Sequence, residues 1–112
     1  MSVINQVTFT ELKQVSGDDF INELIDTFLE DAPKMIEEIR SALASGNVET
    51  FRRAAHSMKS NAATFGAVEL SALAKELEML GKENKLHETG DRLRALEESF
   101  ASVREALLGL KS

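Results

Sequence analysis

The 112-residue chain has no cysteine, tryptophan or tyrosine, and its only proline is Pro33. Without cysteine, disulfide bonds and thiolate-ligated metal sites are excluded. No apolar run approaches the roughly 20 residues that a membrane-spanning helix needs, so membrane insertion is not expected. The N-terminus also lacks the charged start and apolar core of a signal peptide. These absences predict a cytoplasmic protein.

The net charge of the chain is −6. This balance argues against general nucleic-acid binding, which needs a basic surface. The length suits a single domain over residues 1–112, with one hydrophobic core, and we expect a monomer. Few aromatic residues and many Ala, Leu, Glu and Lys favour packed helices over a sheet.

Two helices are predicted before residue 45. Thr8 and Glu11 have the spacing of a capping box, which predicts a short helix over about residues 8–15. Gly17 ends it, and the apolar spacing then predicts one long helix from about Asp18 to about Ala44. We expect this helix to bend near Pro33, where a backbone hydrogen bond is missing, rather than to divide into two helices.

Three further helices follow, over about residues 48–65, 67–83 and 86–110. Gly46 and Asn47 separate the long helix from the first of these, and Gly66 separates the first from the second. Short connections between long helices make neighbours antiparallel. The predicted fold is therefore all-α: an antiparallel up-down four-helix bundle over about residues 18–111, with the short N-terminal helix across one end.

His56 lies outside the predicted core. At about 100° per residue, one face of its helix is apolar and His56 lies roughly 140° away from that face. The apolar positions are Phe51, Ala55, Met58, Ala62 and Phe65. Helical spacing gives His56 four neighbours, which are Arg52, Lys59, Ser60 and Ala63. From residue 50 to residue 68 there are three basic residues and no acidic one, which suits a site that holds a phosphate.

The stretch around His56 resembles the histidine-containing phosphotransfer (HPt) domain. The family signature is roughly Ala-His-x-x-Lys-Gly-Ser-Ser/Ala-x-x-x-Gly-Ala. The matching residues are Ala55, His56, Lys59, Ala62, Gly66 and Ala67. Ser60 and Asn61 depart from it, and we interpret them as tolerated because both are small. The downstream pair Leu77-Glu78 also fits the family pattern.

The resemblance implies that His56 is the phosphorylation site. Histidine suits this role because its ordinary pKa of about 6.5 leaves the ring largely neutral in the cell. Lys59 is expected to pair with the phosphoryl oxygens, and Arg52 to assist. In the family, the Mg²⁺ ion comes from a receiver domain of a response regulator or hybrid kinase, whose aspartate gives or takes the phosphoryl group. We thus expect no metal or cofactor site in this chain and no independent kinase activity.

The receiver is expected to dock around the middle of the histidine helix. Four residues form the predicted docking surface: Ser60, Ala63, Phe9 and Leu12. An exposed edge around Ile21 or Phe28 would extend it, although covering the core is the favoured role for Phe9. Gly66 is assigned a structural role.

Three alternatives compete with this interpretation of the sequence. A di-iron bundle needs Glu-x-x-His pairs, but Arg53 and Asn84 occupy the positions three residues before the two histidines. A purely structural bundle explains neither the outward His56 nor the acid-free stretch. The substrate domain of a chemotaxis-type kinase stays open, although the motif resemblance favours a relay that accepts the phosphoryl group from one receiver and passes it to another. The direction of net phosphoryl flow and the choice between a separate relay protein and a domain of a hybrid kinase also stay open.

Overall fold

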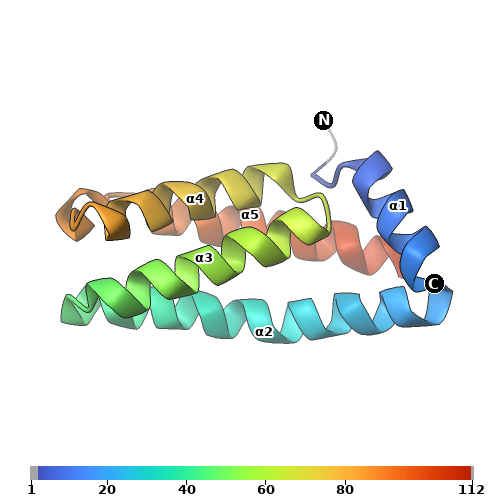
Figure 1. Ribbon diagram of the computed structural model, residues 1–112, viewed down its shortest axis with the longest axis horizontal. Coiled ribbons are helices and arrows are strands. Elements are labelled where there is room, and N and C mark those ends of the chain that lie inside the picture. Colours follow the sequence, from blue (N-terminus) through green and yellow to red (C-terminus); the bar gives the residue numbers. More distant parts are fainter. Residues whose placement is uncertain (1–2, 112) are drawn as a thin grey trace.

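The computed structural model describes residues 3–111, which form five α-helices and one 3₁₀ turn with no strand. Four helices make an antiparallel up-down bundle: α2 (Asp18–Ser45), α3 (Val48–Thr64), α4 (Val68–Lys82) and α5 (Arg92–Leu110) (Figure 1). The short helix α1 (Gln6–Ser16) crosses the end of the bundle where the C-terminus lies. The all-α bundle prediction is confirmed. Among these helices, none is long and apolar enough to span a membrane.

Helix α1 begins two residues earlier than predicted. Its N-cap is Asn5, whose side-chain oxygen accepts a hydrogen bond from the backbone N–H of Thr8 at 3.0 Å. The predicted capping box at Thr8 is therefore wrong, because Asn5 already satisfies the free amide and Thr8 lies inside the helix.

Helix α2 runs without a break through Pro33, so the prediction of one long helix is confirmed, while the bend stays a prediction. It ends at Gly46, which adopts the left-handed conformation with φ 72°. Asn47 then caps α3 by accepting a hydrogen bond from the backbone N–H of Thr50 at 3.1 Å. The tight connection directs α3 back along α2 in the antiparallel sense.

The last helix is shorter than predicted. Asn84 takes a positive φ of 57° after α4, and residues Leu86–Glu88 form the 3₁₀ turn η1. Helix α5 begins only at Arg92, so Leu86 packs against the core from a turn rather than from a helix. Its apolar side chain alone could not distinguish these two backbone conformations.

A continuous apolar core fills the bundle. Phe28 of α2 contacts aromatic rings from two other parts of the bundle. The centroid of its ring lies 5.1 Å from that of Phe65, at the end of α3, and 5.9 Å from that of Phe100 in α5. Fully burying a side chain such as Phe51 or Met58 contributes about 1.5–3 kcal/mol to folding. This core holds α3 firmly in place, with one of its faces left open to solvent.

Candidate functional site

The two faces of α3 are as predicted. Its apolar positions are all buried: Phe51, Ala55, Met58, Ala62 and Phe65. The side chain of His56 points away from them and is 56 % exposed. A buried stripe thus anchors the helix while the imidazole stays accessible to a partner.

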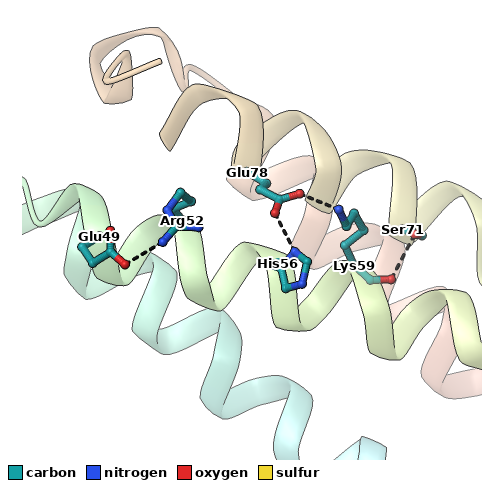
Figure 2. A network of polar contacts seen from close by, with 6 residues as sticks. All are labelled: Glu49, Arg52, His56, Lys59, Ser71 and Glu78. Atoms are coloured by element: carbon teal, nitrogen blue, oxygen red, sulfur yellow. Dashed lines mark hydrogen bonds and ion pairs between the residues drawn. The ribbon is translucent and has the colours of Figure 1, made fainter. Parts of the chain in front are cut away.

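A glutamate of α4 reaches across to this imidazole. The Oε2 atom of Glu78 lies 2.6 Å from Nδ1 of His56, and its Oε1 atom accepts a hydrogen bond from Nζ of Lys59, also at 2.6 Å (Figure 2). The Glu78 side chain is only 3 % exposed. Both carboxylate oxygens are therefore paired, as a buried charge requires.

Glu78 is ionised at neutral pH. Burial opposes its charged form and is the largest single influence on its pKa, but the hydrogen bonds and electrostatic interactions with Lys59 and His56 outweigh it. Together they lower the pKa of Glu78 below its ordinary value of 4.5. An ionised carboxylate can only accept hydrogen bonds. The hydrogen in the contact thus belongs to Nδ1 of His56, and in the neutral form of the ring the lone pair lies on Nε2.

The two predicted cations behave differently. Lys59 lies beside His56 but is held by Glu78, with 29 % of its side chain exposed. Arg52 turns away from His56 and donates to Oε1 of Glu49 at 2.6 Å, as Figure 2 shows. Its guanidinium is thus engaged one turn away from the imidazole, and its assistance at the phosphate site stays a prediction.

Gly66 has the structural role that was predicted. Its φ is +77°, a conformation that residues with a Cβ rarely adopt. A Cβ there would also lie 3.0 Å from the backbone oxygen of Asn5. The carbonyl of Gly66 accepts a hydrogen bond from the N–H of Asn5 at 2.8 Å. The glycine therefore ends α3 and lets α1 dock on the α3–α4 turn.

The predicted docking surface is only partly available. Ser60 and Ala63 are exposed, in line with His56 on α3. Phe9, Ile21 and Phe28 are at most 3 % exposed. The core role favoured for Phe9 is therefore confirmed, and the exposed edge expected around Ile21 or Phe28 is wrong. Leu12 is half-buried against the core. These apolar side chains contribute more free energy in the core than on the surface, which is the reason for the difference.

From the sequence, Glu78 is only part of the family pattern, and its contact with His56 is not predicted. The stretch from residue 50 to residue 68 has no acidic residue. In the folded protein, however, α4 places Glu78, which lies 19 residues after Lys59 in the sequence, against this stretch. A signal existed: Glu78 continues the line of Ala74 and Gly81 at spacings of four and three. Small residues on one line indicate a close helix contact, and an acid among them must face the neighbouring helix.

This geometry leaves a nucleophilic nitrogen exposed and oriented. Across residues 3–111, the His, Asp and Glu side chains form no group of three or more that could hold a metal ion. Glu78, the acid nearest His56, already has two basic partners. The residues of the site thus suit reception of an anion.

Comparison with known proteins gives consistent results. A family model described as "Hpt domain" matches residues 23–106. The phosphorelay protein LuxU of Vibrio harveyi is 32 % identical over 88 residues, which cover 79 % of this chain and 77 % of the relative. LuxU of Vibrio vulnificus is 30 % identical over 92 residues, covering 81 % of this chain and 80 % of the relative.

A solved structure has the same architecture. The crystal structure of histidine-containing phosphotransfer protein B (HptB) from Pseudomonas aeruginosa PAO1 superposes with a TM-score of 0.91 at 28 % identity. The similarity covers 97 % of this chain and 94 % of that one. It therefore includes α1, which lies before the residues that the family model matches.

Proposed function

This chain belongs to the Hpt domain family, the histidine phosphotransfer modules of phosphorelays, and on that basis we propose that His56 carries the phosphoryl group. His56 receives it from an aspartate of one receiver domain and passes it to another. The observation that supports this most directly is the contact between Nδ1 of His56 and the buried carboxylate of Glu78. It leaves Nε2 of an exposed ring as the free nucleophile.

The transfer requires one bond to form and one to break. The lone pair of Nε2 attacks the phosphorus of the receiver's aspartyl phosphate; the P–N bond forms as the P–O bond to the aspartate breaks, and the aspartate leaves as a carboxylate. The ring of His56 gains a positive charge. Glu78 keeps its contact with the Nδ1–H group and offsets that charge without taking the proton. Transfer to the second receiver is the reverse reaction.

Lys59 is proposed to stabilise the phosphoryl group during transfer. Its ammonium group lies one turn from His56 and is bound to Oε1 of Glu78. An approaching phosphoryl group competes for this ammonium, so part of the Lys59–Glu78 interaction is exchanged for one with the phosphoryl oxygens. Positive charge placed where negative charge accumulates lowers the barrier. Arg52 would have to leave Glu49 before it could assist.

The metal ion and the phosphorylated aspartate are assigned to the partner. We propose that the receiver supplies the Mg²⁺ ion together with its phosphorylated aspartate, and that this chain has no kinase activity of its own. The relatives found here are named phosphorelay proteins, which favours a relay between receivers over the substrate domain of a chemotaxis-type kinase.

The central test uses the two histidines of the chain. The purified protein is incubated with a receiver domain that carries a labelled phosphoryl group, and acid-labile, base-stable label is measured on this chain. His56→Gln should abolish the label with little change in helicity or thermal stability, because the side chain lies outside the core. His87→Gln is the matched control, since His87 is exposed in η1 and should accept no phosphoryl group.

Two outcomes would contradict the assignment. Label retained by His56→Gln would place the phosphorylation site elsewhere. Label lost in His87→Gln, with His56 intact, would do the same. Circular dichroism on both variants shows whether either change acts through unfolding instead.

A separate experiment tests where the receiver docks. Ser60 and Ala63 follow His56 along the exposed face of α3, so a bulky side chain there should obstruct the receiver. Ala63→Trp should block transfer while the fold is retained. Ala101→Trp, on an exposed position of α5, is the control and should transfer normally. Normal transfer by folded Ala63→Trp would place the docking surface elsewhere.

A further inference from the structure

Gly81 lies where α3 and α4 approach one another closely. It is a buried residue in the last turn of α4, and it has no positive φ that would by itself call for glycine. A Cβ at this position would lie 3.0 Å from Cβ and 3.1 Å from Cα of Arg52, and 3.3 Å from a ring carbon of Phe51. The missing side chain thus supplies space.

This close approach is next to the functional site. Gly81 lies three residues after Glu78 on α4, and Arg52 lies four residues before His56 on α3. Because the helices are antiparallel, the Gly81–Arg52 contact and the Glu78–His56 contact are neighbouring turns of one interface. On the other side of Glu78, the hydroxyl of Ser71 donates to the backbone oxygen of Lys59 at 3.0 Å. Close contacts therefore bracket the glutamate.

The contact between Glu78 and His56 depends on the spacing between α3 and α4. The 2.6 Å contact between Glu78 and His56 joins two side chains from different helices, so it lengthens when the helices separate. Arg52 Cα is a backbone atom and cannot rotate away from a new methyl group. Relieving the clash therefore requires α4 or α3 to move by a few tenths of an ångström.

We propose that Gly81 is a positioning residue for phosphotransfer: its missing side chain sets the α3–α4 spacing at which Glu78 holds the Nδ1–H form of His56. The inference rests on the proposed role of His56. It means that a glycine outside the site controls the orientation of the nucleophilic imidazole.

The test follows the imidazole directly. Nitrogen NMR on labelled, unphosphorylated protein, at a pH where His56 is neutral, reports which ring nitrogen carries the hydrogen. In the wild type it should be mainly Nδ1. Gly81→Ala should shift the population towards the Nε2–H form and slow transfer roughly two- to fivefold, since the hydrogen bond weakens as it lengthens. Gly81→Val, with a larger side chain, should increase the Nε2–H population further and slow transfer more.

Matched controls separate positioning from general effects of changing a helical glycine. Gly109 lies in α5, and a Cβ there would meet no atom within 4 Å. Gly109→Ala and Gly109→Val should keep the wild-type tautomer and transfer rate. Adding Arg52→Gly to Gly81→Ala removes the closest clashing atom but leaves the Cα of residue 52 at 3.1 Å, so the tautomer should move part of the way back towards the wild type. If Gly81→Ala does not fold, the double variant is compared with Arg52→Gly alone and should show less of the Nδ1–H form, because the contact with the Cα of residue 52 remains.

The inference is overturned if folded Gly81→Ala and Gly81→Val both keep the wild-type tautomer, because the end of α4 would then absorb the clash without moving Glu78. It is also overturned if the double variant shows no recovery. The tautomer measurement needs no receiver, so its failure is distinct from the failure of His56 as the phosphorylation site.

Discussion

Two charge clusters in this protein each join two helices, and the charge of the central side chain is negative in one and positive in the other. In the Glu78 cluster (His56, Lys59 and Glu78), one acid of α4 binds two basic side chains of α3. In the Arg40 cluster (Glu37, Arg40 and Glu97), one base of α2 binds two acids, one of them from α5. The central side chain is 3 % exposed in the first cluster and 47 % exposed in the second.

The difference in burial gives the two clusters different consequences. The contacts favour the charged form in both, lowering the pKa of Glu78 and raising the pKa of Arg40. Arginine is always charged in proteins, so the shift at Arg40 changes nothing, and water can replace its partners. Glu78 is almost without water and depends on its two partners. Only the buried cluster can therefore fix the orientation of a side chain.

Among the changes that compare the two clusters and leave His56 in place, the largest effect is expected from removing the buried acid. Glu78→Ala should slow transfer about tenfold, because His56 loses the group that keeps the hydrogen on Nδ1, and a hydrogen bond to a charged group is typically worth about 1.5 kcal/mol or more. Glu97→Ala is the matched change in the Arg40 cluster and should leave the rate unchanged. Equal rates for Glu78→Ala and the wild type would remove the distinction between the clusters.

A smaller effect is expected from Lys59→Ala. Transfer should slow by roughly three- to tenfold without stopping, because the ammonium stabilises phosphoryl charge but forms no bond to phosphorus. The defect should shrink at high salt, where the wild-type attraction is screened. Lys111→Ala is the control, since Lys111 binds Asp26 on the surface at 2.6 Å. A wild-type rate for Lys59→Ala at every salt concentration would contradict this role.

The pH dependence of stability distinguishes the clusters further. Because the pKa of Glu78 is lowered below 4.5 by folding, its ionised form stabilises the native state. This contribution should be complete above about pH 4.5 and should decline as the pH falls through the lower folded value. The free energy of unfolding of the wild type minus that of Glu78→Gln, from urea titrations, should therefore decrease on acidification. A difference independent of pH would contradict a lowered pKa of Glu78 in the folded protein.

The smallest effect is expected from the exposed base. Arg40→Gln should change the thermal midpoint by no more than about 2 °C, because exposed ion pairs contribute little after their desolvation and ordering costs. Differential scanning calorimetry measures this change, with Arg94→Gln as the control for an exposed pair within one helix. A large loss of stability would show that the α2–α5 contact at Arg40 is structurally important.

The sequence by itself determined the bundle and the position of His56. Apolar residues at spacings of three and four define which face of each helix is buried, and that periodicity is local. Gly46 and Asn47 marked a helix boundary for equally local reasons, since one tolerates a positive φ and the other caps an amide. His56 could be placed outside the core by counting angles around a single helix.

Tertiary structure decided which charges and apolar groups meet. The sequence left open whether Phe28 lies at an exposed edge or in the core, and favoured the core for Phe9; the packed bundle buries both side chains. Arg52 and Lys59 occupy similar positions around His56, but only Lys59 faces Glu78, while Arg52 packs beside Gly81 and turns to Glu49. Helical periodicity describes one helix at a time. The distance between α3 and α4, which brings the buried carboxylate to the imidazole, follows only from how their side chains pack together.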